Sequence, residues 1–156
     1  MAVTSGVGSM DEAEVREMFE TNKAGLLSLV DGDKPYAVAL EHYFDGKNLY
    51  FATSLKLGQR KMDCIRNNPR ACYTLYDSRR DKPEIVSKGI RCRSILVEGR
   101  VSVAGVKELE DKQFGKVQLQ MLKMEIDMIG NWKCPRKECH WHEQWFKRHP
   151  DLVTGL

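Results

Sequence analysis

The chain has 156 residues, of which 42% are hydrophobic and 30% charged, and this balance fits one globular domain with its own core and excludes a disordered chain. The net charge is only +3 and the basic residues are spread along the chain, so the sequence gives no reason to expect nucleic-acid binding. Because no run of about 18 apolar residues and no secretory signal is visible, we expect no membrane span, and the five cysteines fit a reducing cytoplasm better than a disulfide framework.

The first half of the chain predicts a short helix followed by three strands. Residues 11–22 have apolar residues at the i, i+3, i+4 spacing of an amphipathic helix. Tight turns that contain Asp-Gly pairs separate the three apolar runs that follow. The predicted strands span residues 24–30, 36–44 and 48–54. These segments predict a β-meander built from two hairpins.

Two more helices are predicted further along the chain. Residues 58–68 read as a helix of about three turns, which Pro69 ends. The segment 106–130 also looks helical, because its apolar residues recur at spacings that give a helix apolar faces. Gly115 is expected to break or kink this last helix.

The remaining strands decide the fold class. Residues 71–77 predict a strand, and residues 89–105 predict a long one with a bulge or bend at Gly99. Because hairpins connect most of the strands, we expect an antiparallel sheet that closes into a small barrel of about six strands. The expected fold is therefore mainly β with flanking helices.

The connection from the third strand to the second helix has the ingredients of an anion site. The hydroxyls of Thr53 and Ser54 end the strand, and Arg60 and Lys61 begin the helix. A helix N-terminus with two nearby cations suits a phosphate group. A solvated turn with two surface charges is the alternative that these residues leave open.

Two blocks of sequence resemble a known family. "PYAVALEHYFDGKNLYFATS" with "GQRKMDCIRNNPRACYTLY" is the first block, and "RCRSILVEGRV" is the second. In this order they resemble the FMN-binding split-barrel superfamily, which includes pyridoxamine 5′-phosphate oxidase and the nitroimidazole-resistance-type flavoproteins. The resemblance covers roughly residues 24–103. It implies a small antiparallel split β-barrel and a homodimer with FMN near the interface.

The resemblance also implies which residues hold FMN. The predicted cofactor-binding residues fall into three sets. The phosphate would be held by Thr53, Ser54, Arg60 and Lys61. The flavin ring would lie beside Val38 and Ala39, and it would be reached from the long strand by Arg93 and Ser94. A flavin needs an apolar wall, a few backbone donors and acceptors, and a cation for its phosphate. Tyr36 and Glu41 stand where the oxidase would carry basic residues, so the nitroimidazole-resistance type is the nearer match.

The implied activity is that of an FMN-dependent oxidoreductase, a flavin reductase that passes hydride or electrons from a reduced nicotinamide to a small oxidant. The flavin itself would carry the chemistry, which fits a chain without a triad or a carboxylate pair. His42 is the candidate for a catalytic side chain, against the alternative of a hydrogen-bonded strand residue. A flavin, deazaflavin or haem-binding module without turnover is the second hypothesis.

The segment 131–156 is rich in Trp, Cys and His. Cys134, Cys139 and His142 could ligate zinc, although their spacing matches no standard finger, so a metal-binding protein is the third hypothesis. The alternative is a segment that packs on the barrel or on a partner subunit. We therefore expect a flexible tail at 1–10, a split-barrel FMN-binding domain at 11–130 and this C-terminal segment.

Overall fold

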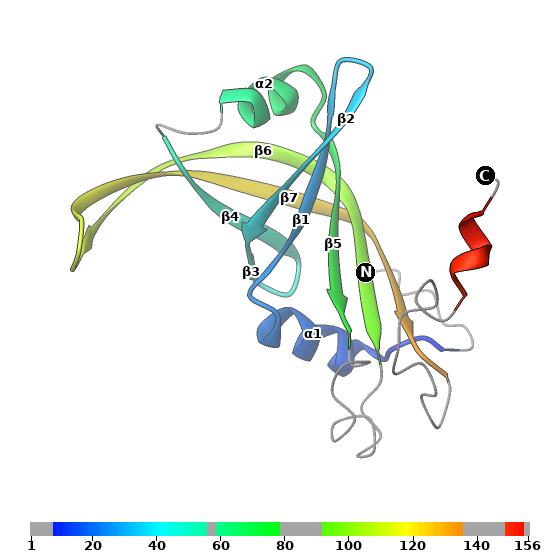
Figure 1. Cartoon of the computed structure of the whole chain (residues 1–156). Helices are drawn as coiled ribbons and strands as arrows, with labels where there is room; N and C mark the ends of the chain where they lie inside the picture. The colour runs from blue at the N-terminus through cyan, green and yellow to red at the C-terminus, as the bar shows by residue number, and fades with distance from the viewer. Residues whose placement is uncertain (1–7, 56–58, 79–91, 136–148, 155–156) are drawn as a thin grey trace.

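The computed structural model describes residues 8–55, 59–78, 92–135 and 149–154, and its helices and strands are labelled in Figure 1. Its elements in chain order are α1 (Glu12–Thr21), β1 (Ala24–Asp31), β2 (Lys34–Glu41), β3 (Tyr43–Phe44), β4 (Asn48–Ser54), α2 (Gln59–Asn67), β5 (Arg70–Asp77), β6 (Arg93–Asp111), β7 (Gly115–Lys133) and the 3₁₀ helix η1 (Pro150–Val153). None of the helices in this described part is long and apolar enough to cross a membrane.

Helix α1 forms where the sequence predicts a helix. Asp11 caps its N-terminus in a capping box: the Asp11 carboxylate accepts from the backbone N–H of Glu14, and the Glu14 side chain accepts from that of Asp11. The helix buries Val15, Met18 and Phe19, the three apolar residues of the predicted face. The apolar residues that recur at helical spacing therefore form the face of α1 that packs into the core.

The seven strands of the described residues form one antiparallel sheet in the order β2-β1-β5-β6-β7-β4-β3. The prediction of a mainly β protein with an antiparallel sheet is confirmed, with more strands than expected. Among the described residues, β2 and β3 are the two edges, and no pairing between them closes the sheet. The chain also breaks the predicted strand 36–44 at His42, which lies between β2 and β3.

The predicted helix at 106–130 is wrong. Its first residues continue β6, and the rest form β7, which pairs with β6 along nearly its whole length. The outer face of β7 carries apolar residues up to Met121, and its inner face carries them from Leu122 onward. Apolar residues on both faces of a strand recur at spacings of three and four, which imitate a helix.

The turn between β6 and β7 confirms the hairpin. Gly115 has a positive φ of 68°, which is a left-handed conformation that favours glycine. The Asp111 carboxylate accepts from the backbone N–H groups of Gln113 and Phe114. Gly115 therefore ends a turn and does not kink a helix.

The sequence predicts a bulge or bend at Gly99, and the pairing of β6 with β7 is irregular there: Glu98 is opposite Met128 and Gly99 is opposite Ile126, so the extra residue is Asp127 of β7. The pairing register with β7 shifts between Glu98 and Gly99. A Cβ at position 99 would lie 2.1 Å from the backbone oxygen of Glu125, so the two strands approach too closely for any side chain. The bulge bends β6 and β7, which curve across the whole molecule in Figure 1.

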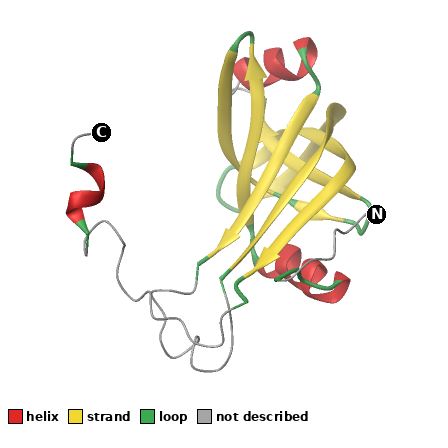
Figure 2. Ribbon diagram, turned by 90° about the vertical axis from the view of Figure 1, so that its right-hand side faces the viewer, coloured by secondary structure: helices red, strands yellow, loops and turns green. Residues whose placement is uncertain are grey.

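The sheet wraps around one apolar core, and the two long helices lie at its opposite ends (Figures 1 and 2). Helix α1 lies across one end, and α2 lies near the tip of the β1–β2 hairpin. The β6–β7 hairpin continues past the body of the sheet as an arm, where residues 102–110 of β6 are all exposed. The fold thus has an α1 end, an α2 end and a projecting arm.

The described part of the predicted tail packs on β7. Met10 is buried, and its backbone N–H donates to Oδ1 of Asn131 at 2.6 Å. The backbone N–H of Lys133 donates to the carbonyl of Gly8. β7 itself continues past residue 130, and the division of the chain into three parts stays a prediction.

Candidate functional site

Lys61 is the most unusual charged residue in the described part of the chain. It lies in the first turns of α2, and only 7% of its surface is exposed. Within the described residues no carboxylate pairs with its ammonium group, and burial lowers the pKa of this group. A buried cation without a partner is costly, and the described residues supply no anion to offset this cost.

Arg60, the neighbouring residue, points elsewhere. Its Nε donates to Oδ2 of Asp31 at 2.7 Å, and its guanidinium lies 4.5 Å from the centre of the Tyr36 ring. Both partners belong to the β1–β2 hairpin, so Arg60 fastens α2 to that hairpin. Its side chain is 55% exposed, and the structure therefore separates the two cations that the sequence grouped.

Thr53 and Ser54 end β4, five residues before α2 begins. Thr53 is buried, and its hydroxyl donates to the carbonyl of Ser54 at 3.3 Å. Ser54 is exposed on the outer face of the sheet, opposite Leu119 of β7. The two predicted hydroxyl residues therefore face opposite sides of the strand that leads to Lys61.

Val38 and Ala39 also face opposite sides of their strand. Val38 packs against the core, and Ala39 is exposed. Among the described residues β2 pairs only with β1, so its other edge presents unpaired backbone N–H and C=O groups. The predicted backbone contacts of Val38 and Ala39 with a flavin would be made at this edge, and they stay a prediction.

Ala39 belongs to an open hollow of about 620 Å³, here called the ring hollow. The hollow lies between the edge strand β2 and the outer face of β4 and β7, and its lining residues are Ala39, Leu40, Glu41, His42, Tyr43, Tyr50, Ala52 and Met121. Its volume is in the range of small-molecule sites. Two tyrosines, Tyr43 and Tyr50, lie with ring centres 6.3 Å apart at one side of it.

His42 lines the ring hollow, but both nitrogens of its ring form hydrogen bonds with other residues of the protein. Its Nε2 lies 2.9 Å from the carbonyl of Phe19, and its Nδ1 lies 2.8 Å from the hydroxyl of Tyr73. Because a carbonyl only accepts, Nε2 carries a hydrogen, and burial lowers the pKa of the imidazole. Both ring nitrogens are therefore used in packing α1 and β5 together, which favours the structural alternative.

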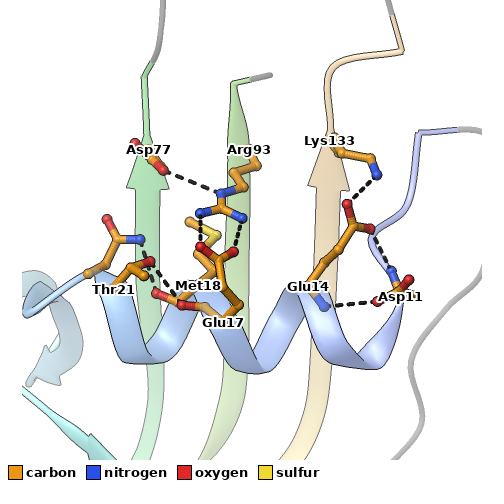
Figure 3. Close-up of polar contacts among 9 residues, drawn as sticks. Asp11, Glu14, Glu17, Met18, Thr21, Asp77, Arg93 and Lys133 are labelled. Atoms are coloured by element: carbon orange, nitrogen blue, oxygen red, sulfur yellow. Dashed lines mark hydrogen bonds and ion pairs between the residues drawn. The ribbon is translucent and has the colours of Figure 1, made fainter. Parts of the chain in front are cut away.

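Arg93 and Ser94 lie at the α1 end of the sheet, away from the other predicted residues. Arg93 donates to Glu17 through both terminal nitrogens and to Oδ2 of Asp77 through Nε (Figure 3). These contacts raise the pKa of Arg93, with the Glu17 hydrogen bond as the main cause. The guanidinium is thus committed to the carboxylates of α1 and β5.

The strand register gives the distance between the Arg93–Ser94 pair and the residues at the end of β4. Ser94 is opposite Trp132 of β7, whereas Thr53 is opposite Gln120 of the same strand. Twelve residues of strand correspond to about 40 Å along β7. Within one chain, the structure therefore does not bring the Arg93–Ser94 pair to the end of β4.

The possible metal ligands fall mostly outside the described residues. Cys139 and His142 lie outside them. Cys134 is described: its backbone N–H donates to the carbonyl of Cys92 at 2.8 Å. Within the described part no three His, Cys, Asp or Glu side chains form a group that could hold a metal ion.

The sequence did not predict that Tyr50, Ala52 and Met121 line the ring hollow. Tyr50 and Ala52 alternate with the buried residues of β4, and this alternation was the available signal. Met121 was missed because its segment looked helical. The hollow forms only when β2, β4 and β7 come together, which no local pattern reveals.

The chain matches the protein-family model described as pyridoxamine 5′-phosphate oxidase over residues 11–140. It therefore belongs to this family of split-barrel, flavin-binding proteins. No curated protein matches the chain significantly in sequence.

Solved structures show the same fold at low sequence identity. A candidate 5-nitroimidazole antibiotic resistance protein from Bacteroides thetaiotaomicron is 14% identical with a TM-score of 0.55, over 80% of this chain and 85% of that chain. An FAD-binding protein from Mesorhizobium loti is 18% identical with a TM-score of 0.53, over 80% and 94%. A candidate pyridoxamine 5′-phosphate oxidase from Listeria innocua is 20% identical with a TM-score of 0.55, over 80% and 98%.

Proposed function

We propose that the protein is an FMN-dependent oxidoreductase, a flavin reductase related to the nitroimidazole-resistance-type proteins. The observation that carries the proposal is Lys61, a buried cation for which the described chain provides no anion. A ligand phosphate would supply the missing charge, and membership of a flavin-binding family supports a flavin as its carrier.

Different residues of one chain would bind different parts of the cofactor. Lys61 would bind the phosphate together with the hydroxyls at the end of β4, Thr53 and Ser54. Arg60 would add a second cation through its terminal nitrogens, because its Nε alone binds Asp31. The open edge of β2 at Val38 and Ala39 would offer backbone groups to the polar edge of the ring.

When bound, a flavin supplies hydride and electron transfer, and we propose a reduced nicotinamide as donor and a small oxidant as acceptor. The chain contributes binding and orientation. Tyr43, Tyr50 and Met121 form an apolar side of the ring hollow, which suits a flat aromatic ligand. Glu41 is the one carboxylate in the lining and is exposed.

A homodimer is part of this proposal, because one chain does not bring Ser94 to the ring hollow. Ser94 lies on the outer face of the sheet between two exposed aromatic residues, Tyr76 and Trp132. Leu26 and Leu96 are also exposed on β1 and β6. Such an apolar face suits burial against a second copy, which would bring Ser94 to the partner's site.

A cofactor-binding module without turnover is the second candidate. The hydrogen bonds of His42 favour it, because they leave no imidazole nitrogen free to serve a substrate in the ring hollow. A reduced nicotinamide added without oxygen separates the two candidates. Bleaching of the bound flavin near 450 nm followed by recovery with an added oxidant is the behaviour of the oxidoreductase.

The binding site itself is tested by titration of FMN into the protein. Replacing both Arg60 and Lys61 by Ala is expected to weaken FMN binding by more than tenfold, about 1.4 kcal/mol or more. Arg66→Ala is the matched control, because Arg66 is an exposed cation in the last turn of the same helix. An unchanged FMN affinity in the double variant would show that the phosphate binds elsewhere.

A further inference from the structure

The ring hollow has few charged groups, and their balance is negative. Glu41 is the one carboxylate of the lining, and the described residues that line the hollow include no lysine or arginine. His42 adds no positive charge near neutral pH, because burial lowers the pKa of its imidazole and both ring nitrogens are hydrogen-bonded. The fixed charge of the lining is therefore that of Glu41.

Two tyrosines form an aromatic side of the same hollow. The rings of Tyr43 and Tyr50 have centres 6.3 Å apart, and their planes are inclined at 39°. Tyr43 is 67% exposed, so most of its surface is open to a ligand. A cation is attracted to the face of an aromatic ring when it lies within about 6 Å of the ring centre. One bound cation can lie within this range of both rings.

Tyr50 offers the hollow its ring rather than its hydroxyl. The phenol forms a hydrogen bond with the carboxylate of Asp45, and this bond is the main cause that raises the pKa of Tyr50. Asp45 accepts from the backbone N–H groups of Asn48 and Lys47, and the Asn48 bond is the main cause that lowers its pKa to about 2. A second ionised carboxylate is thus held at the hydroxyl end of Tyr50.

The cation that lies opposite Tyr50 in the strand register has a partner of its own. This residue is Lys123 of β7, which is not part of the lining. Its Nζ lies 3.2 Å from Oε1 of Glu125. A neighbouring carboxylate therefore offsets the charge of Lys123, and the hollow keeps its negative balance.

We propose that the small oxidant of the ring hollow is a planar aromatic cation, such as an N-alkylated nitrogen heteroaromatic, which stacks on Tyr43 and Tyr50 with its charge toward Glu41. The proposal rests on the proposed function, because it names the acceptor of that reaction. The reduced nicotinamide gives its hydride to the flavin, and the flavin passes it to a ring carbon of the cation. One donor is oxidised for each cation reduced, and no proton is taken up. The reduced product is neutral, so it loses the attraction that held the cation.

The test uses three ligands of one shape and different charge: N-methylacridinium, neutral acridine and acridine-9-carboxylate. Isothermal titration calorimetry at pH 8 gives their dissociation constants for the FMN-loaded protein. We expect the cation to bind at least tenfold more tightly than acridine, because two rings and one carboxylate attract it. The anion is expected to bind more weakly than acridine.

Substitutions in the lining assign this preference to its residues. Glu41→Gln removes the charge at nearly the same shape and should lower the preference for the cation about threefold. Tyr43→Leu removes one ring and should lower it by about the same factor, whereas Tyr43→Phe should keep it, because a phenyl ring also attracts cations. Glu108→Gln is the control: Glu108 is an exposed carboxylate of the projecting arm, it lies 3.5 Å from Nζ of Lys116, and it is not in the lining.

Equal binding of acridine and its cation by the wild-type protein overturns the proposal. A preference that Glu41→Gln and Tyr43→Leu leave unchanged also overturns it, because the attraction then comes from the bound flavin. An equal loss in Glu108→Gln shows a general effect of net charge, with the same consequence. FMN binding is measured on the same samples. A wild-type protein that does not bind FMN refutes the proposed function and this acceptor with it, whereas normal FMN binding without a preference for the cation refutes the acceptor class alone.

Discussion

The two ends of the sheet treat their positive charges in opposite ways. At the α1 end, Arg93 is held by Glu17 and Asp77, and Lys133 by Glu14 (Figure 3). At the α2 end, Lys61 is buried without an anionic partner among the described residues. The paired cations of the α1 end fasten one element to another, whereas the unpaired one among the described residues at the α2 end is the basis of the proposed phosphate site.

Two predictions that rest on the same family resemblance therefore concern residues with different surroundings. The sequence assigned both Arg93 and Lys61 to the cofactor on the strength of the family resemblance. The carboxylates that engage Arg93 come from α1 and from β5, which are 60 residues apart in the chain (17 to 77). Only the folded structure reveals that this guanidinium is already used.

The largest expected loss of stability comes from a substitution that breaks the ion pairs at the α1 end of the sheet. Arg93→Ala would remove the guanidinium that binds both Glu17 and the Asp77 carboxylate, whose side chain is only 14% exposed. We expect the free energy of unfolding to fall by about 3 kcal/mol, the cost of breaking a largely buried ion pair by removing one of its partners. Urea unfolding measures it, with Lys116→Ala of the exposed arm pair as control. A loss below about 1 kcal/mol would contradict the assigned role of this network.

Lys61→Met tests the other side of the comparison, at the α2 end of the sheet. The stability of the ligand-free protein should rise, whereas its affinity for FMN should fall. Removing a desolvated charge without a partner is expected to raise the free energy of unfolding of the ligand-free protein by about 1 kcal/mol. FMN affinity should fall more than tenfold. A variant that loses stability and keeps its FMN affinity would make Lys61 a structural residue.

The third prediction concerns pH and His42, which joins α1 to the sheet. Burial lowers the pKa of His42 below its ordinary value of 6.5, so the unfolded chain binds a proton more readily than the folded one. The contribution to stability is present above about pH 6.5 and is lost as pH falls through the folded pKa. We expect the free energy of unfolding to decline between pH 7 and pH 5.

His42→Gln tests the origin of this decline. Glutamine keeps a donor and an acceptor but does not titrate, so the variant should have a flatter dependence on pH over the same range. The slopes are compared, not the absolute stabilities, because the substitution also changes packing. Equal slopes in the two proteins would assign the decline to other groups.

The smallest expected effect is at the partly exposed pair of the α1 end. Lys133 Nζ lies 2.5 Å from Oε1 of Glu14, and each side chain is 35% exposed. Lys133→Ala should cost about 0.5 kcal/mol, and the difference from wild type should shrink in 1 M salt. Urea unfolding at two salt concentrations checks this. A salt-independent loss would mean that packing of the lysine stem accounts for it.

The sequence predicted the elements that local patterns specify. The helix at 11–22 has its cap and apolar face within a few residues, and the hairpins around Gly32 and Gly46 have glycines with positive φ at their turns. The segment 106–130 was misassigned because β7 is apolar on its outer face and then on its inner face. A strand that changes its buried face cannot be recognised by period alone.

Local sequence was therefore enough for the mainly β class, for α1 and α2, for the β1–β2 and β3–β4 hairpins and for the irregular pairing at Gly99. The strand register decided the rest: the separation of Arg93 and Ser94 from Thr53 and Ser54, and the ring hollow between β2, β4 and β7. The physical reason is range. Turns, caps and periodicity act between residues close in the chain, whereas ion pairs and hollows depend on which distant strands lie side by side.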